Sequence, residues 1–461
     1  MPDATAPNRS VSNSPAPNNT TGSRGKLRPI QLAAVIFLTV SGGPYGLEPL
    51  FSYVGTHGAL LLLLITPLLW DVPTILTVLE LNSLMPVTGG YYQWVKHALG
   101  IRWAFFEGWW TWLYTFCDLA IYPVLFVTYA AFFFPAAERY HVPICLTIIW
   151  ASALLNILGI VPVGKVSIVL SVLVITPFLL TVGLLFAHHA PISIPAPAIH
   201  NPHFSTLSLG LYTVMWNFIG WDNATTYAGE VTRPVRSYLT SVCLAFLLVI
   251  TIYVLATLAV HQSGIDTSKF GEGDFPLVGE LIGGHWLGML IAAGGMASTL
   301  GLYSAVLLSV SRVPKVMAED QLLPVWLCAQ HRRFATPYVS IIASSLIVSI
   351  LILFTFSDLV VMDIILYGAG LTLEFLSLLA FRRREPERLR PFRIPLSTTG
   401  LLLMVLLPIG VYGIALSGAL WSSEKMALPV GLALSMLLSA ELAWRLVLWR
   451  NPHLASASPR S

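Results

Sequence analysis

The stretch Ser41-Gly42-Gly43-Pro44-Tyr45-Gly46 interrupts an apolar run, residues 29–54, that is otherwise long enough to cross a bilayer as one helix. Three glycines and a proline within six residues remove side-chain packing and one backbone donor, so we expect the helix to break here. Backbone groups that lose their partners at membrane depth are tolerated only where protein, water or a ligand satisfies them. The stretch is therefore a candidate binding site, and Glu48 places an ionisable group beside it.

The composition indicates an all-α polytopic membrane protein. Of 461 residues, 56% are hydrophobic and 10% are charged, and the mean hydropathy is +0.76. The net charge of +3 is too small to suggest a nucleic-acid partner. No CxxC pair occurs, so a disulfide framework is not expected from the four cysteines, which are Cys117, Cys145, Cys243 and Cys328.

Apolar runs predict about twelve transmembrane helices at roughly 20 residues per crossing. A Pro-, Ser-, Asn- and Thr-rich segment, residues 1–28, precedes them, and we interpret it as a disordered cytoplasmic tail and not as a secretory signal. After residues 29–54, the runs lie near residues 58–83, 101–133, 142–162, 165–188, 206–230, 236–260, 286–318, 337–355, 359–381, 398–420 and 427–449.

The placement of basic residues predicts the orientation. With a cytoplasmic N-terminus, the outer loops hold only Arg139, Lys269 and Lys425 of the 25 Lys and Arg residues. This is a strong positive-inside bias, so both termini are expected to be cytoplasmic and the protein to lie in the cell (inner or plasma) membrane. The arginine cluster of residues 382–393 is interpreted as an anchor of topology, in preference to a lipid-binding site.

A second break is predicted in Trp216-Asn217-Phe218-Ile219-Gly220-Trp221-Asp222-Asn223, where polar residues and glycine interrupt the sixth run. The first and sixth crossings are five apart, so they enter the membrane from opposite sides. Paired broken helices of this kind are typical of inverted five-helix repeats that hold a substrate at the midplane. The expected divisions are residues 29–190 and 191–385 for the two repeats, 386–450 for two further helices, and 451–461 for a cytoplasmic tail.

Acidic residues fall deep in the predicted helices. Asp118, Asp71 and Glu48 have no Lys or Arg at matching depth, and each would cost roughly 2.5–3.5 kcal/mol if unpaired. Protonation or hydrogen bonding across helices is the alternative to a functional role, and for Asp71 the two interpretations stay equally open. Three others lie nearer the cytoplasmic ends and are expected to snorkel or to pair with basic loop residues, namely Glu80, Glu107 and Glu374.

A buried carboxyl group that takes up a proton outside and releases it inside would couple transport to the proton gradient. Lys165 lies at the start of the predicted fifth helix, so an amine-based proton switch inside that helix is not expected. Ser298 and Thr299 offer a sodium site as the less favoured alternative. Tyr45 and Trp221 lie at the breaks, where an aromatic ring can cover an ammonium group and act as a gate.

Enzyme motifs are missing from the sequence, which contains no HExxH, GxSxG or Walker A pattern, and a catalytic function is not expected. The spacing of four histidines in one outer loop does not favour a metal site; they are His188, His189, His200 and His203. Neither a cofactor nor a metal is predicted. The predicted partners are a small-molecule substrate, a coupling proton and the lipid bilayer, and no obligate protein partner is evident.

Five stretches give the chain a family resemblance. They are Ser41-Gly-Gly-Pro-Tyr-Gly-Leu-Glu48, Pro86-Val-Thr-Gly-Gly-Tyr-Tyr-Gln-Trp94, Asp118-Leu-Ala-Ile-Tyr-Pro-Val-Leu125, Trp221-Asp222 through Ala228-Gly-Glu-Val231, and Met317-Ala-Glu-Asp-Gln-Leu-Leu-Pro324 with Thr336-Pro337. Across roughly three quarters of the chain they resemble the amino acid, polyamine and organocation superfamily of secondary transporters. Within it the chain is most similar to the plant and protozoan polyamine:proton symporters, also called L-type amino acid transporter homologues.

The resemblance implies the leucine-transporter type of fold, with alternating access and substrate held at the first and sixth helices. It implies that Glu48, Asp118 and Asp222 meet a cationic substrate or a proton. The candidate substrate-binding residues are Ser41, Gly42, Gly43, Tyr45, Gly46, Glu48, Asp118, Tyr122, Trp216, Asn217, Trp221 and Asp222.

One departure from the family pattern bears on the substrate. Gly301-Leu302-Tyr303 is followed by Ser304-Ala305-Val306, where the plant polyamine carriers are expected to have acidic residues. The expected function is therefore import of polyamines or amino acids, by proton symport. A neutral or cationic amino acid carrier or exchanger, sodium coupling, and a transport-inactive amine sensor remain as alternatives. For a zwitterionic substrate, the amide groups of residues 42–46 would hold the carboxylate.

Overall fold

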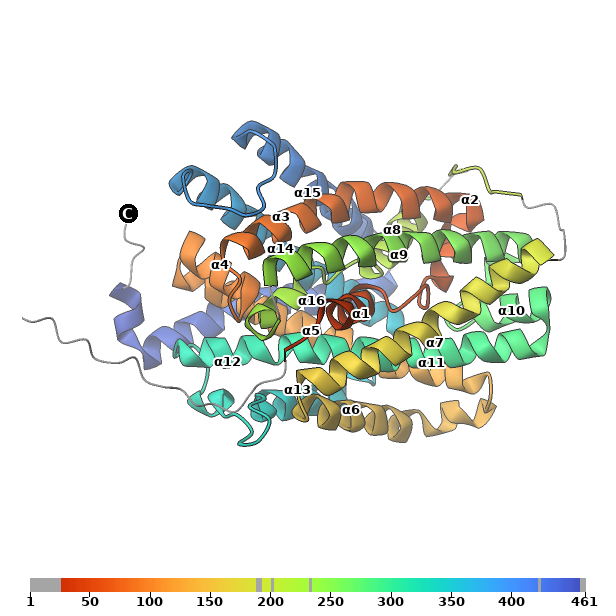
Figure 1. Ribbon diagram of the computed structural model, residues 1–461, viewed down its shortest axis with the longest axis horizontal. Coiled ribbons are helices and arrows are strands. Elements are labelled where there is room, and N and C mark those ends of the chain that lie inside the picture. Colours follow the sequence, from red (N-terminus) through yellow and green to blue (C-terminus); the bar gives the residue numbers. More distant parts are fainter. Residues whose placement is uncertain (1–25, 188–192, 200–202, 232–233, 422–423, 457–461) are drawn as a thin grey trace, which may run out of the picture.

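The computed structural model describes residues 26–187, 193–199, 203–231, 234–421 and 424–456, and within these ranges the chain is helical, without a strand. One isolated backbone bridge joins Leu27 to Val231. Figure 1 shows most helices lying side by side along the long axis of the molecule, with α4 and α12 at one end and α10 at the other. These two ends are called the α12 end and the α10 end below. Most of the predicted N-terminal tail and His188, His189 and His200 lie outside the described residues.

The helix bounds agree closely with the apolar runs. In chain order the α-helices are α1 (Pro29–Val40), α2 (Glu48–Thr66), α3 (Val72–Leu84), α4 (Gly90–Leu99), α5 (Ile101–Ala131), α6 (His141–Ile157), α7 (Ile160–Ala187), α8 (Phe204–Trp216), α9 (Pro234–Ser263), α10 (Phe275–Gly283), α11 (His285–Val310), α12 (Arg312–Glu319), α13 (Tyr338–Leu351), α14 (Phe356–Arg384), α15 (Thr398–Trp421) and α16 (Glu424–Arg450). A π-helical turn, η1 (Pro67–Asp71), joins α2 to α3, and η3 (Asn223–Glu230) is a 3₁₀ helix.

Nine helical segments of the described chain are long and apolar enough to cross a membrane, and α1 and α13 are shorter apolar helices. The multi-pass helical architecture predicted from composition is thereby confirmed. Two of the twelve predicted crossings are interrupted, and helix length alone does not identify them. The total of twelve therefore stays a prediction.

Both interruptions are present. The first separates α1 from α2, and α2 itself has an irregularity at Gly55 (φ 66°), next to residue 54, where the first crossing was expected to end; that end stays a prediction. The second separates α8 from η3, so the sixth run is not one helix but an α-helix, a short turn-rich loop and a 3₁₀ segment.

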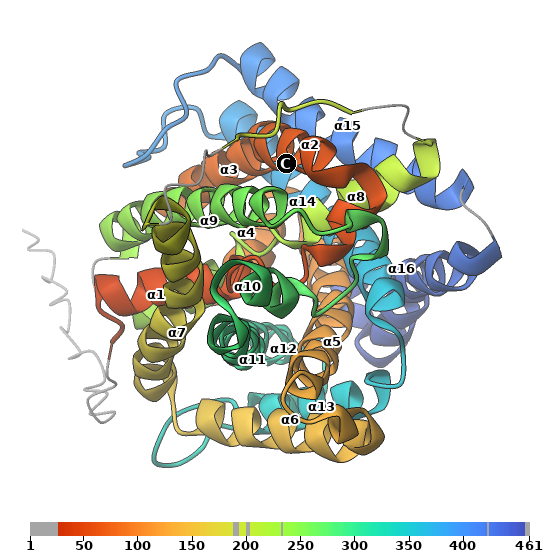
Figure 2. The same ribbon diagram turned by 90° about the vertical axis from the view of Figure 1, so that its right-hand side faces the viewer.

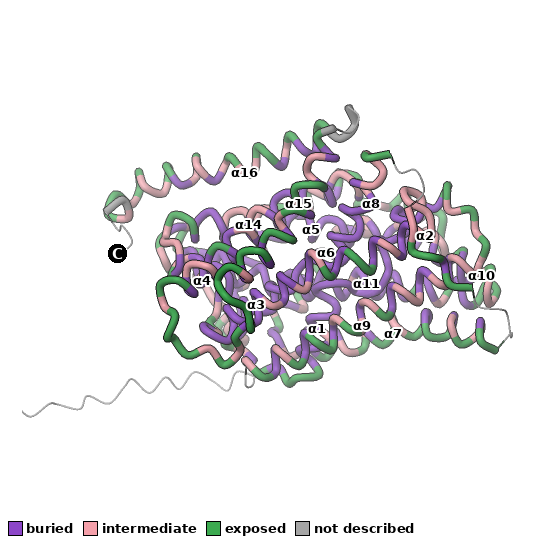
Figure 3. Tube along the Cα trace, turned by 90° about the horizontal axis from the view of Figure 1, so that it is seen from above, coloured by how far each residue is buried: buried purple, intermediate pink, exposed green. Residues whose placement is uncertain are grey.

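The core of the bundle is formed by α5, α11 and α14, which are the most buried of the long helices. In the end-on view α11 lies inside a ring of other helices (Figure 2). The last two helices lie at the periphery, and Figure 3 shows α16 along one edge with exposed residues on much of its length. Apolar side chains on these outer faces, such as Leu438 and Leu442, suit contact with lipid.

The boundary between the fourth and fifth helices differs from the prediction. The fourth was expected to reach residue 162 and the fifth to begin at 165, whereas α6 ends at Ile157 and α7 begins at Ile160. Gly159 lies between them with φ 114°, a conformation that favours glycine and stops a helix. Lys165 is therefore in the second turn of α7. The short helices α4 and α10 were not predicted as separate elements.

Candidate functional site

The first interruption is closed by its own side chains. Gly43 N donates to Ser41 Oγ (3.1 Å), and Gly46 N donates to Glu48 Oε2 (2.7 Å). Tyr129 from α5 donates its hydroxyl to the other oxygen, Glu48 Oε1. Glu48 is the first residue of α2 and is fully buried, so its carboxyl group lies at the N-terminus of the helix that leaves the break. A helix N-terminus is a favourable place for a negative charge.

The second interruption is held mainly by tyrosines from other helices. Tyr253 Oη donates to the carbonyl of Asn217 (2.7 Å), and Tyr238 Oη donates to the carbonyl of Trp221. Gly220, at φ 94°, allows the turn between them. The carbonyl groups released from helix geometry are therefore satisfied inside the protein, as a non-helical segment in a membrane requires.

The two interruptions meet. Asn217 Nδ2 lies 3.5 Å from the carbonyl oxygen of Gly46, and a Cβ placed on Gly46 would be 2.6 Å from the Trp216 ring. On the other side, a Cβ on Gly220 would be 3.2 Å from the carbonyl oxygen of Thr39. Glycine at positions 46 and 220 thus permits the close approach that forms one site from two distant segments of the chain.

Gly46→Ala is expected to destabilise the protein by about 2–4 kcal/mol, because the added methyl group overlaps the Trp216 ring and the positive φ of 92° also disfavours alanine. Gly55→Ala is the matched control, since Gly55 has φ 66° but no atom within 4 Å of its added Cβ. Its cost should be limited to about 1–2 kcal/mol of backbone strain. Thermal unfolding in detergent measures both, and equal losses would show that crowding at Trp216 contributes nothing.

Asp118, from the middle of α5, lies beside the second interruption. Its Oδ1 accepts hydrogen bonds from Tyr122 Oη (2.5 Å) and Trp216 Nε1 (3.3 Å). Asp363 of α14 is within electrostatic reach of Asp118, and neither of its carboxyl oxygens, both buried, has a hydrogen-bond partner. Asp363 was not predicted as a site residue, although an acidic residue inside the apolar run 359–381 is a signal of the same kind as Asp118.

Asp222 ends the second interruption and faces α14. Its Oδ1 accepts the Tyr367 hydroxyl (2.9 Å), and Glu374 and Glu107 are within electrostatic reach. The expectation that Glu107 and Glu374 snorkel or pair with basic loop residues is wrong. Both are 1% exposed, neither makes an ion pair, and each has one oxygen without a partner, because they point from α5 and α14 into the bundle.

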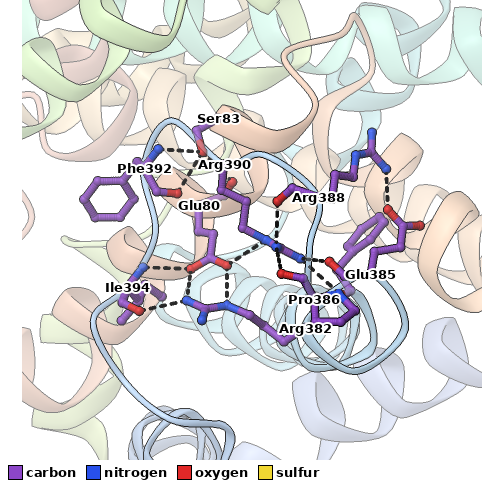
Figure 4. Close-up of polar contacts among 10 residues, drawn as sticks. Glu80, Ser83, Arg382, Glu385, Pro386, Arg388, Arg390, Phe392 and Ile394 are labelled. Carbon is purple, nitrogen blue, oxygen red and sulfur yellow. Dashed lines mark hydrogen bonds and ion pairs between the residues drawn. The ribbon is translucent and has the colours of Figure 1, made fainter.

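For Glu80 the expected pairing with a basic residue is confirmed. Arg382 donates through Nε and a terminal nitrogen to the two Glu80 oxygens (both 2.6 Å), and Arg390 Nε lies 3.3 Å from Oε1 (Figure 4). The backbone N–H of Ile394 donates to Oε2 at 2.9 Å. This group, called the Glu80 clasp below, joins the end of α3 to the end of α14 and the loop that follows it.

The aromatic groups predicted as gates are already engaged. Trp221 Nε1 donates to Asp71 Oδ1 (3.0 Å), which places Asp71 against the second interruption and leaves its Oδ2 without a partner. Tyr45 Oη donates to the carbonyl of Ile291 (3.0 Å), and its ring packs edge-on against Tyr129. In this conformation both rings pack against the protein and cover the site.

Both ends of the site are closed. At the α12 end, Leu27 N donates to the carbonyl of Glu230 (3.1 Å), whose side chain pairs with Arg312 (3.1 Å). At the α10 end, the Tyr45 ring contacts those of Phe178 and Phe275. The structure therefore has an occluded arrangement, with the candidate residues buried between the two closures.

One further carboxyl group lies in the loop before α10, within electrostatic reach of Glu48. This is Glu272, and partial burial together with the nearby charge of Asp274 raises the pKa of its carboxyl group. The loop thus places a carboxyl group of raised pKa next to the closed α10 end.

One observation, the environment of Ser298, is compatible with the alternative of a sodium site. Ser298 Oγ is buried without a partner, and a Cβ on Gly42 would lie 2.7 Å from it, so Ser298 borders the first interruption. Thr299 donates its hydroxyl to its own helix, at the carbonyl of Met296 (2.9 Å). His203, the described member of the histidine loop, precedes α8, and no cluster of metal-ligating side chains occurs among the described residues.

Electrostatics define the kind of ligand that the site suits. Seven buried carboxyl groups make no ion pair with any Lys, Arg or His residue that the structure describes. They must be neutralised by protons or by a cationic ligand, because an uncompensated buried charge is costly. The seven residues are Glu48, Asp71, Glu107, Asp118, Asp222, Asp363 and Glu374.

A multi-pass helical bundle in which two interrupted helices meet around buried carboxyl groups is an architecture of transporters for small solutes. The family model for amino acid permeases matches residues 27–431, and the chain belongs to this family. The family and the relatives named below are likewise transporters, not enzymes.

Among its relatives, polyamine transporter PUT1 of Oryza sativa subsp. japonica is 33% identical over 393 residues, covering 84% of this chain and 73% of the relative. A probable polyamine transporter of Arabidopsis thaliana is 35% identical over 393 residues, covering 83% and 80%. Polyamine transporter RMV1 of Arabidopsis thaliana is 31% identical over 420 residues, covering 90% and 84%. A further relative, from Legionella pneumophila, is named only as an uncharacterized transporter.

Proposed function

We propose that this protein imports small cationic amines without a carboxylate group, polyamines in preference to amino acids, by proton symport and alternating access. The proposal includes twelve crossings, the leucine-transporter type of inverted repeat over residues 29–190 and 191–385, and two further helices. It also places both termini in the cytoplasm and the protein in the cell membrane. The polyamine transporters among its relatives support the substrate class.

The observation that carries the choice of substrate is the position of Glu48. An amino acid would need to place its carboxylate on the free amides of the first interruption, at the N-terminus of α2. The Glu48 carboxyl group accepts the hydrogen bond from Gly46 N, and Gly42 N and Gly43 N donate to Phe37 O and Ser41 Oγ. The protein thus supplies its own carboxylate where a zwitterionic substrate would supply one.

In this proposal Asp118 and Asp222 bind ammonium groups. Asp118 lies against the Trp216 ring system and Asp222 against Tyr367, so each carboxylate is combined with an aromatic side chain. A carboxylate and an aromatic face together favour an organic cation, through ion pairing and cation–π contact. The remaining candidate residues, at the two interruptions, form the walls of the site and its closures.

Cadaverine and lysine provide a direct test, since they differ only by the carboxylate. Purified protein in proteoliposomes is expected to take up cadaverine and putrescine, with lysine and ornithine competing at least about tenfold more weakly. Imposed proton and sodium gradients are applied separately, and the proton gradient is expected to drive uptake. Equal competition by cadaverine and lysine would contradict the substrate assignment, and stimulation by sodium alone would contradict the coupling ion.

Glu48 variants separate charge from hydrogen bonding. Glu48→Gln removes the ionisable carboxyl group, so it is expected to abolish proton-driven diamine uptake. It keeps an acceptor for Gly46 N, so lysine should stay a poor competitor. Glu48→Ala leaves Gly46 N without its acceptor, so this N–H can bind the carboxylate of lysine. Competition by lysine should therefore improve by about tenfold relative to cadaverine. Competition against bound cadaverine in detergent measures this ratio without transport. An unchanged ratio in Glu48→Ala would show that Glu48 does not occupy the place of a substrate carboxylate.

A further inference from the structure

Two neighbouring core helices carry matching series of side chains. α5 and α14 pack more extensively against each other than any other pair of helices in the described chain. On each helix an acidic residue begins the series, and another ends it eleven residues later. The members are spaced by three or four residues, so each series occupies one face of its helix. The series are Glu107, Thr111, Tyr114 and Asp118 on α5, and Asp363, Tyr367, Gly370 and Glu374 on α14.

The two series run in opposite directions, and their end members and their tyrosines meet. Asp118 and Asp363 interact at one end, and Glu107 and Glu374 interact at the other. Between them the Tyr114 and Tyr367 rings make an edge-to-face contact with centroids 5.3 Å apart. The contact region between the helices thus contains two acidic pairs separated by an aromatic section, and it is called the α5–α14 seam below.

The Glu107–Glu374 pair contains buried polar atoms for which the protein supplies no partner. Glu107 Oε2 and Glu374 Oε2 are buried without a hydrogen-bond partner, and the Tyr91 hydroxyl, within electrostatic reach of both, is also without one. Gly370 leaves the space for Glu107, since a Cβ there would lie 3.2 Å from its Oε1. Asp222 adds a third carboxyl group to the pair.

The separation of the two acidic pairs corresponds to the length of a polyamine. Eleven residues of α-helix span about 16 Å, at about 1.5 Å per residue. An extended saturated chain advances about 1.2 Å per bond, so a tetraamine such as spermine, with thirteen bonds between its terminal nitrogens, also spans about 16 Å. A diamine such as putrescine, with five such bonds, spans about 6 Å and reaches only one pair.

We propose that the α5–α14 seam binds a linear polyamine lengthwise, with one terminal ammonium group at the Asp118–Asp363 pair and the other at the Glu107–Glu374 pair. The Tyr114 and Tyr367 rings then line the methylene chain, and Asp222 meets an internal ammonium group. This inference rests on the proposed function and adds selection by amine length. The seam is closed in the occluded arrangement, so the ligand enters when the covering helices move, as alternating access requires.

The first experiment needs no variant. Unbranched α,ω-diamines with 4 to 12 carbons compete with labelled spermine for the purified protein, and affinity is expected to rise in a step of at least about tenfold when the chain reaches both pairs. A smooth gain per methylene group would overturn the proposal, because it would indicate only apolar contact. If no amine binds the wild-type protein at any length, the proposed function fails, which is a different result.

Variants at the Glu107–Glu374 pair provide the second experiment. Glu107→Gln and Glu374→Gln should weaken spermine uptake by about tenfold or more, while putrescine uptake changes by less than about twofold. Gly370→Ala keeps every charge but crowds Glu107, so it should act in the same direction. Glu441→Gln, an exposed glutamate on α16, is the control for loss of a carboxylate and should leave both amines unaffected.

The outcomes are distinct. Loss of spermine uptake alone supports the lengthwise site. An equal loss of putrescine and spermine uptake would assign the Glu107–Glu374 pair to proton coupling or to folding, and would overturn the proposal, as would no loss for either amine. Gel-filtration profiles and melting temperatures identify variants that fail to fold. If the variants fail to fold, the diamine series on the wild-type protein tests the lengthwise site by itself.

Discussion

Asp118→Asn is expected to reduce amine uptake by about 100-fold. Asparagine keeps the shape of the side chain and an oxygen that can accept from Tyr122 and Trp216, so the variant removes the negative charge and little else. A hydrogen bond to a charged group is worth about 1.5–3 kcal/mol. In this buried site no water replaces the lost contact between the ammonium group and the carboxylate. Initial rates of putrescine uptake into proteoliposomes measure the effect.

Tyr122→Phe is the control for the hydrogen bonds around Asp118. It removes one donor but keeps the carboxylate, so uptake should fall by no more than about tenfold. The melting temperature of Asp118→Asn should equal or exceed that of the wild type, because the variant relieves the proximity of two carboxyl groups. Near-normal uptake by Asp118→Asn would remove Asp118 from the amine site.

Arg382→Ala is expected to destabilise the protein by about 3–5 kcal/mol. The variant leaves Glu80, which is fully buried, without its two shortest ion-pair contacts and frees the carbonyl of Ile394, to which Arg382 also donates. Breaking one side of a buried ion pair costs this much because the other charge stays buried. Thermal unfolding in detergent should show a large decrease in melting temperature.

Arg388→Ala, in the loop that follows α14, is the matched control. Arg388 pairs with Glu385 on the surface, both side chains being about 40% exposed, and surface pairs contribute about 0–1 kcal/mol. Replacing both Glu80 and Arg382 by methionine should restore part of the lost stability, since it removes the buried unpaired carboxylate but leaves the buried Arg390 side chain without its ion pair to Glu80. Similar losses for Arg382→Ala and Arg388→Ala would mean that the Glu80 clasp is not a stabilising element.

The helical class and both interruptions could be predicted because their causes are local. Apolar runs of fixed length specify membrane helices, and the glycines and Pro44 of the first break disfavour a helix whatever surrounds them. The same reasoning identified Glu48 and Asp118 as deep acidic residues. The second break was recognised from Asn217 and Gly220 in an otherwise apolar segment.

The partners of the acidic residues could not be predicted because they depend on tertiary packing. Glu107 and Glu374 lie near the ends of their runs, so distance along the sequence suggested contact with basic loop residues. The rotation of α5 and α14 instead turns both carboxyl groups towards each other. Asp363 was missed for the same reason, since only the packing of α14 against α5 places it next to Asp118.

The position of Glu48 also determines how transport responds to membrane voltage. In the proposed function this carboxylate belongs to the protein and does not leave with the cargo, so a transported amine would cross with its positive charges uncompensated by a travelling anion. Each elementary charge gains about 2.3 kcal/mol per 100 mV, so a diamine gains about 4.6 kcal/mol from an interior-negative potential of that size. This corresponds to an accumulation of more than about a thousandfold, and the carrier should produce an inward current with each turnover.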